Sequence, residues 1–231
     1  MSLAKTYEVD GEQITLSPNI VAKLITGRND IPQTEVVKFI ALCAARKLNP
    51  FTGDVYMTAY STRDGVKTSI VVGKETFTKR AQRCPKFRGM EAGVTVITRN
   101  GQIERRPGSM VGGQTEKLIG GWCKVYIDGW DVPAYDEVSF EEYNTGKSLW
   151  LTKPATMIRK VAIVHALREA FPDEFQGMYD ASEMGVEEPK APAPDPEPVI
   201  EEPVIQPEPE QPMQAVYDDD SDEDYLFGGS F

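Results

Sequence analysis

Positive charge is concentrated in one short stretch of this chain. Residues 73–89 contain six Lys or Arg side chains and a single acidic one. Helical periodicity places Phe77 and Ala81 on one face of a helix at 74–84, with the cations on the opposite side. Clustered Lys and Arg side chains bind nucleic-acid phosphates regardless of base sequence. The stretch is therefore a candidate phosphate-binding surface, and a helix face that is merely solvated is the alternative.

A second set of cations lies in a long apolar helix that we expect at about residues 154–171. On a helical wheel, Lys153, Lys160 and Arg168 converge on one arc, whereas Arg159 points away. Long cationic side chains that emerge from a mostly buried helix must reach water, a carboxylate or a ligand phosphate. These residues are therefore either a further phosphate contact or members of internal salt bridges.

Three aromatic residues near these elements are candidates for stacking on nucleobases. They are Phe51, Tyr56 and Trp150. Each of them is also a reasonable core residue, so the sequence leaves both roles open.

Catalytic chemistry finds little support in the sequence. The single histidine, His165, lies in the apolar helix, and no nucleophile elbow accompanies it. Residues 73–76 lack the glycine spacing and the Ser or Thr of a phosphate-binding loop, and the acidic run at 218–224 lacks the spacing of an EF-hand. The three cysteines have neither metal-ligand nor disulfide spacing. We therefore expect a protein that is not an enzyme and needs no metal or cofactor.

The net charge of −11 is unevenly distributed along the chain. Residues 186–231 hold 14 acidic residues, one Lys and 9 of the 17 prolines, so this segment is expected to be disordered. Residues 1–185 hold 24 Lys or Arg against 22 Asp or Glu, a mildly basic balance. The sequence therefore predicts one folded core at 1–185 and an acidic, Pro-rich tail. No signal peptide or membrane-spanning run is evident, so we expect an intracellular protein.

The pattern of secondary structure predicts an α+β fold. Asn100-Gly101 marks a hairpin because this dipeptide accepts positive φ at both turn positions. Ser139 and Glu142 form a capping box for a brief helix. A short helix is expected between Ser17-Pro18 and Gly27. Other predicted helices are 32–48, 74–84 and about 154–171, and the predicted strands are 54–60, 67–72, 94–99, 102–105, 121–127 and 130–135.

Several stretches, taken in order, resemble a known family. They are LNPFTGDVY at 48–56, VVGKETFTKRA at 71–81 followed by FRGMEAGV at 87–94, the segment at 150–171, and FQGMYDASEM at 175–184. Their order and spacing resemble the phage Bet/RecT-type single-strand annealing proteins over roughly residues 35–184.

This resemblance implies a function and an assembly. The function is ATP-independent binding of single-stranded DNA and its annealing to a complementary strand during phage recombination. The assembly is a homo-oligomeric ring or helical filament in the cytoplasm of a bacterial host cell. The implied fold is a bent antiparallel sheet with hairpins, packed beside a long helix and shorter helices. The core at 1–185 would then serve both DNA binding and oligomerisation.

The resemblance also selects residues by their positions. Arg159 and Arg168 match basic residues of the family, and Lys160 lies at a basic position as well. Other basic positions of the family are neutral or apolar here: Ala155, Thr156 and Val161. Lys153 is a candidate to replace them. The full set of candidate DNA-binding residues is Lys74, Lys79, Arg80, Arg83, Lys153, Arg159, Lys160 and Arg168.

Other functions and partners stay open at this point. The first alternative is a passive protein that protects single-stranded DNA without annealing it. The second is a metal-dependent nuclease that uses scattered carboxylates such as Asp54, Glu91 and Asp128. Candidate partners are a host single-stranded-DNA-binding protein and a phage exonuclease. The tail could dock such a partner, compete with DNA for the basic surface, or only add solubility.

Overall fold

The computed structural model describes residues 4–63 and 65–185, and the tail expected at 186–231 lies outside these residues. The described part has the predicted α+β fold with antiparallel sheets. Its strands are β1 (Lys5–Val9), β2 (Glu12–Leu16), β3 (Val55–Thr62), β4 (Gly65–Val72), β5 (Phe87–Ile97), β6 (Ile103–Pro107), β7 (Lys117–Ile127) and β8 (Ala134–Ser139). Its α-helices are α1 (Pro18–Ile20), α2 (Gln33–Arg46), α3 (Lys74–Arg83), α4 (Phe140–Tyr143), α5 (Leu149–Thr152), α6 (Pro154–Ala170) and α7 (Pro172–Phe175). A π-helix, η1 (Val21–Thr26), and two 3₁₀ segments, η2 (Pro50–Thr52) and η3 (Gly113–Thr115), complete the described elements.

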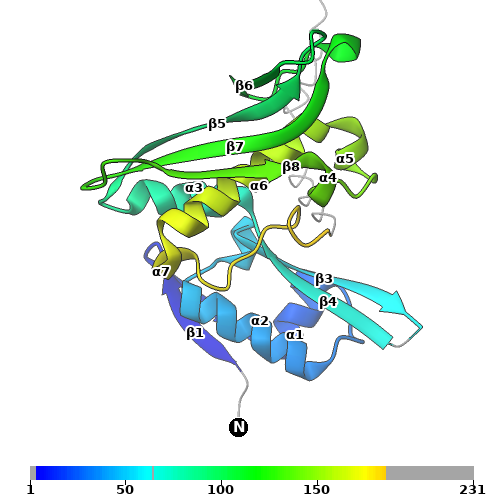
Figure 1. Ribbon diagram of the computed structural model, residues 1–231. Helices are drawn as coiled ribbons and strands as arrows, with labels where there is room; N and C mark the ends of the chain where they lie inside the picture. The colour runs from blue at the N-terminus through cyan, green and yellow to red at the C-terminus, as the bar shows by residue number, and fades with distance from the viewer. Residues whose placement is uncertain (1–3, 64, 186–231) are drawn as a thin grey trace, which may run out of the picture. The chain divides into compact units, whose positions relative to one another are not determined.

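The largest sheet has four strands in the order β6-β5-β7-β8, all antiparallel. Helix α6 lies along one face of this sheet and contacts β5, β7 and β8 (Figure 1). Alternate residues of the strands, such as Val94, Cys123 and Val138, are buried on the face toward the core. The sheet therefore supplies one wall of the main core, against which α6 packs.

Helix α6 is apolar on nearly all sides because it is enclosed by several elements. Besides the sheet, it contacts α3, α5 and α7. Nine of its residues are buried: Met157, Ile158, Val161, Ala162, Ile163, Val164, Ala166, Leu167 and Ala170. Pro154 begins the helix, where the missing amide hydrogen costs no helical hydrogen bond. Pro172 follows its end. The predicted limits of this helix agree with the structure to within one residue.

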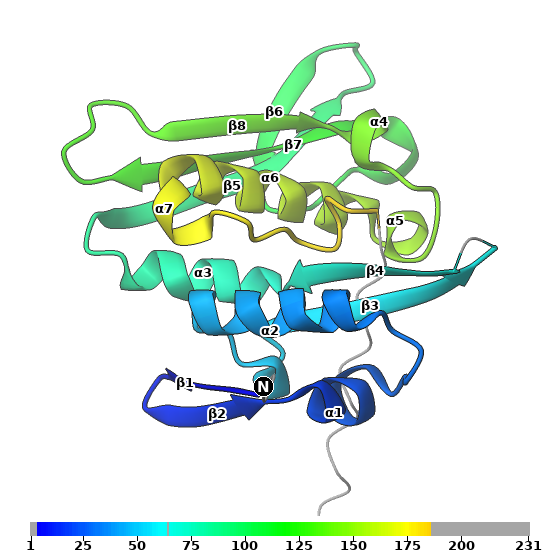
Figure 2. The same ribbon diagram turned by 90° about the horizontal axis from the view of Figure 1, so that it is seen from below.

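Two hairpins make up the other sheets. The β1–β2 hairpin contacts α2, and the β3–β4 hairpin contacts η1. Figure 2 shows α2 running alongside β3 and β4, with α3 continuing from the end of β4. Helix α3 contacts both α6 and β5, so it connects this part of the fold to the four-stranded sheet.

Residues 176–185, which we name the closing segment, follow α7 and return along α6. The backbone N–H of Val72 donates to the carbonyl of Tyr179 at 2.8 Å, which fastens the segment to the end of β4. Met178 and Ala181 are buried, with 0% and 2% of their surfaces exposed. The closing segment is therefore part of the core. No helix among residues 4–63 and 65–185 is both long and apolar enough to cross a membrane.

The structure departs from the predicted elements in several places. The strand expected at 130–135 is β8 at Ala134–Ser139, β7 begins four residues before the expected strand at 121–127, and the short helices α5 and α7 were not predicted. The β1–β2 hairpin was not predicted, although its turn is an Asp10-Gly11 dipeptide. Strand β5 begins seven residues earlier than expected, because Gly89 and Gly93 interrupt the alternating pattern without ending the strand. Helix α4 forms where the capping box predicted a helix, but the side chain of Ser139 makes no capping hydrogen bond.

Candidate nucleic-acid interface

Helix α3 presents its cations because its apolar face is fixed in the core. Phe77 and Ala81 are buried at 0% and 1% exposure, as the helical pattern predicted. The ring of Phe77 stacks on Phe175 of α7 with the centroids 5.3 Å apart. With this face held, the side chains of Lys79 and Arg83 reach solvent, with 59% and 62% of their surfaces exposed.

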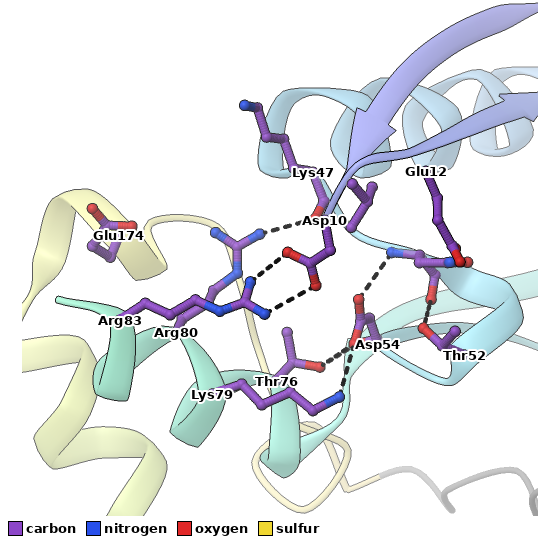
Figure 3. Close-up of a pocket in the computed structure, with 12 residues that line it drawn as sticks. Asp10, Glu12, Lys47, Thr52, Asp54, Thr76, Lys79, Arg80, Arg83 and Glu174 are labelled. Atoms are coloured by element: carbon purple, nitrogen blue, oxygen red, sulfur yellow. Dashed lines mark hydrogen bonds and ion pairs between the residues drawn. The ribbon is translucent and has the colours of Figure 1, made fainter.

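A hollow of about 390 Å³ opens beside this helix (Figure 3). Four elements border it: α3, the β1–β2 turn, the loop between α2 and β3, and the start of α7. Its charged lining consists of four cations and four carboxylates: Lys47, Lys79, Arg80, Arg83, Asp10, Glu12, Asp54 and Glu174. The hollow brings together three of the DNA-binding residues predicted from sequence, which are Lys79, Arg80 and Arg83 on α3.

Asp54 organises the wall of the hollow that the LNPFTGDVY stretch forms. Its carboxylate accepts from the backbone N–H of Asn49 at 3.0 Å and from the hydroxyl of Thr76 at 3.2 Å. It also lies 4.0 Å from the Nζ of Lys79. These contacts hold the loop against the first turn of α3, so Asp54 has a structural role here.

Arg80 points into the hollow from the partly buried side of α3. Its Nη2 donates to the carbonyl of Lys47 at 3.3 Å, and burial lowers the pKa of its guanidinium below the ordinary value. Lys47 adopts a left-handed conformation with φ 49° at the end of α2, which turns its carbonyl toward Arg80. Sequence reasoning missed Lys47, because it lies 32 or more residues before Lys79, Arg80 and Arg83 and only the fold brings it near.

Arg83 makes a bidentate ion pair with Asp10 at the edge of the hollow. Its two Nη atoms donate to the two carboxylate oxygens of Asp10 at 2.7 and 3.0 Å (Figure 3). Asp10 comes from the β1–β2 turn, an element that sequence reasoning did not predict. Its Asp-Gly turn signal was present in the sequence and could have located it.

The predicted cations of α6 occupy a different environment. Lys160 pairs with Asp180 at 3.1 Å, and the two side chains are only 12% and 0% exposed. Arg168 pairs with Glu183 at 2.5 Å and lies 5.0 Å from the ring centre of Tyr179. Both carboxylates belong to the closing segment. These two cations are thus engaged in the internal salt bridges that the sequence left open as the alternative.

The other predicted residues lie outside the hollow as well. Arg159 is partly buried, and its Nε donates to the carbonyl of Ala92 on β5 at 3.2 Å. Lys153 is exposed immediately before α6. Lys74 occupies the first position of α3 and is partly buried. The structure therefore groups Lys79, Arg80 and Arg83 around one hollow and distributes the remaining candidates over other surfaces.

The aromatic candidates separate in the same way. Trp150 is 6% exposed and packs against Phe140 with the ring centroids 6.1 Å apart, so it is a core residue. Tyr56 is partly buried on β3. Phe51 is 51% exposed, in the loop whose neighbouring Thr52 lines the hollow. Phe51 is therefore the most exposed of the three aromatic candidates and lies next in the chain to a residue of the hollow.

The carboxylates suggested for a nuclease have other contacts. Asp54 is held as described above, and Asp128 pairs with Arg88 at 3.3 Å. Glu91 interacts with Tyr126. Burial and the nearby Glu91 carboxylate both raise the pKa of Tyr126. Within residues 4–63 and 65–185, no group of three or more His, Cys, Asp or Glu is placed to hold a metal ion.

Comparison with known proteins places these elements in a family. The model of the RecT family matches residues 12–195, which include α3, the closing segment and most of the residues that line the hollow. The chain is also 30% identical over 162 residues to the uncharacterized protein UU154 of Ureaplasma parvum serovar 3. That alignment covers 67% of this chain and 64% of the relative, so the chain spans about two thirds of the relative's length. The match over residues 12–195 confirms the resemblance seen in the motifs: the chain belongs to the RecT family.

Proposed function

We propose that this protein binds single-stranded DNA and anneals it to a complementary strand without ATP, in homologous recombination of the phage type. The observation that carries the proposal is the RecT-family match over residues 12–195, which contains the basic helix α3. The protein would act as a homo-oligomer, in a ring or a helical filament. Such an assembly multiplies weak phosphate contacts through effective concentration.

The proposed phosphate contacts are four cations of α3: the partly buried Lys74, the exposed Lys79 and Arg83, and Arg80 deeper in the hollow. Lys153 and Arg159 are proposed as contacts beyond the hollow. Lys160 and Arg168 would support DNA binding only indirectly, because each is already paired with a carboxylate of the closing segment. Phe51 would stack on a base beside the bound phosphate.

The mechanism follows from charge neutralisation. Two DNA strands repel each other through their phosphates, and cations that hold one strand by its backbone reduce this repulsion. The bases of the held strand remain available for pairing. Sequence information then comes from pairing between strands, so no base-reading side chain is needed.

Annealing of two complementary oligonucleotides labelled as a fluorescence pair tests this function, with EDTA present and ATP absent. We expect the protein to accelerate annealing well above the spontaneous rate and this effect to weaken as salt is raised. Tight binding together with slowed annealing would contradict the proposal and would favour the passive protective protein.

A triple variant tests the assigned surface. Lys74→Gln, Lys79→Gln and Arg83→Gln together should weaken oligonucleotide binding about tenfold or more and reduce the salt slope by about 2, since each lost contact to a single strand contributes about 0.7. The control is Lys5→Gln, Lys23→Gln and Lys117→Gln, which removes three exposed cations that do not line the hollow. Equal losses in the two triple variants would show that net charge matters and the α3 surface does not.

A further inference from the structure

Asp10 meets Arg83 in a geometry that resembles phosphate recognition. Asp10 and Gly11 form the β1–β2 turn with φ values of 53° and 87°, the left-handed conformations that a tight hairpin turn of this kind requires. The turn directs the Asp10 carboxylate at Arg83, which donates to both oxygens at 2.7 and 3.0 Å. A guanidinium offers the same pair of donors to two oxygens of a phosphate.

Three cations, Lys79, Arg80 and Arg83, interact electrostatically with the Asp10 carboxylate. Hydrogen bonding from Arg83 is the main cause that holds the pKa of Asp10 below its usual range, and the charges of Lys79 and Arg80 lower it further. The carboxylate therefore lies where Lys79, Arg80 and Arg83 all stabilise a negative charge. An anionic group of a ligand at the same point would meet the same three cations.

The contact between Asp10 and Arg83 can be broken at little cost. Their side chains are 60% and 62% exposed, and ion pairs between exposed side chains typically contribute little to stability. By contrast, Asp54 is 15% exposed and is held by a backbone N–H and a hydroxyl group. Asp10 is thus the carboxylate of the hollow that can leave while the walls stay intact.

The other charged groups of the hollow do not replace Asp10 as the partner of Arg83. Within the described part of the chain, Glu12 and Glu174 make no ion pair with a cation. Arg80 donates to a carbonyl and not to a carboxylate, while burial penalises its charge. A ligand anion that replaced Asp10 would therefore gain Arg83, and it would add to the stabilisation that the charge of Arg80 already receives from Glu174 and Asp54.

We propose that Lys79, Arg80 and Arg83 form a phosphate subsite for DNA and that the carboxylate of Asp10 occupies it until a DNA phosphate displaces it. This inference rests on the proposed function, which it deepens by naming a phosphate position and its internal competitor. Asp10 lies two residues before residue 12, where the family match begins.

The substitution Asp10→Asn tests the inference in the full-length protein. Asparagine keeps the turn, because Asn-Gly is also favoured there, and it removes the competing charge. We expect oligonucleotide binding to tighten about two- to fivefold at low salt, on the order of what an exposed ion pair contributes. The matched control is Asp30→Asn, since Asp30 also accepts two hydrogen bonds from one arginine, at 2.8 Å from Nε and 2.5 Å from Nη2 of Arg28, but does not line the hollow.

Two further measurements make the outcome decisive. In a protein that already carries Arg83→Gln, the effect of Asp10→Asn should shrink to that of Asp30→Asn. Binding of inorganic tripolyphosphate tests the subsite without DNA, and the NMR signal of the Arg83 side chain measures it. The Asp10→Asn variant should bind tripolyphosphate more tightly than the wild-type protein does. Equal effects of Asp10→Asn and Asp30→Asn on both ligands would overturn the inference. Failure of oligonucleotide binding alone, with the tripolyphosphate result as expected, would overturn the proposed function and leave the subsite standing.

Discussion

The histidine of this chain lies between two carboxylates. The Nδ1 of His165 is 3.1 Å from Asp136 on β8, and its Nε2 is 2.8 Å from Glu183 in the closing segment. Hydrogen bonding to Asp136 and then to Glu183 raises the pKa of His165 to about 9, and burial opposes this rise. At neutral pH the ring is therefore an imidazolium that donates from both nitrogens and links three separate parts of the chain.

This arrangement predicts a pH dependence of stability. Because the pKa of His165 is higher in the folded than in the unfolded protein, its contribution is complete below about pH 6.5 and is lost as pH rises to about 9. The loss should be on the order of 2–3 kcal/mol of unfolding free energy. Urea unfolding at about pH 6, 7.5 and 9.5 measures it. The variant His165→Gln should lack this part of the dependence, and parallel curves for the two proteins would contradict the assignment.

Among the cations, exposure separates two roles that residue type alone does not. Arg83 and Arg168 each pair with a carboxylate, but their side chains are 62% and 25% exposed. An exposed pair exchanges partners at low cost, whereas removal of one member of a buried pair leaves an uncompensated charge. This difference is why the DNA contacts are proposed on α3 and not at Arg168.

At the scale of elements, the packing of α6 on the sheet depends on glycine in β7. A Cβ atom added at Gly121 would lie 2.6 Å from the carbonyl oxygen of Ile158. The backbone of α6 therefore approaches the strand directly at this point. Gly93 on β5 is similarly restricted, because a Cβ atom there would lie 1.8 Å from the carbonyl oxygen of Arg106.

We expect Gly121→Ala to separate α6 from the sheet and to lower the free energy of unfolding by about 1–3 kcal/mol, the usual cost of overpacking. Thermal or urea unfolding measures the change. Gly112→Ala is the matched control, since its Cβ would meet only the flexible side chain of Glu116. The explanation by backbone contact is wrong if both variants are equally stable.

At the scale of the whole described unit, the closing segment joins regions that are distant in sequence. It accepts a hydrogen bond from Val72 at the end of β4, and it supplies the carboxylates that face Lys160, His165 and Arg168 on α6. We propose that residues 1–185 form the independent folding unit and that the closing segment completes it.

Truncation tests this proposal. A chain ending at residue 185 should unfold at the same urea concentration as the full chain. A chain ending at residue 175 should lose about 3 kcal/mol or more, because buried Met178 is removed and Lys160 and Arg168 lose their carboxylates. Comparable destabilisation by both truncations would place the boundary beyond residue 185.

Several features could be predicted because they depend on local sequence. The spacing of apolar residues in the sequence located α3 and α6, and it correctly predicted that Phe77 is a core residue. The Asn100-Gly101 turn correctly located the hairpin between β5 and β6. The order of the motifs identified the RecT family. Each of these signals lies within a stretch of a few to about twenty residues, where propensity and periodicity operate.

The distribution of the cations into two environments was decided only by the tertiary structure. Asp10 lies 73 residues before Arg83, and Glu183 lies 15 residues after Arg168. No periodicity connects such residues, because the packing of the hairpin against α2 and of the closing segment against α6 sets their distances. The sequence by itself determined the charge, the helices and the family, and the tertiary structure decided which charges face solvent and which are paired inside the core. The physical reason is that secondary structure follows local pattern, whereas the partner of a charged side chain depends on which distant segment packs beside it.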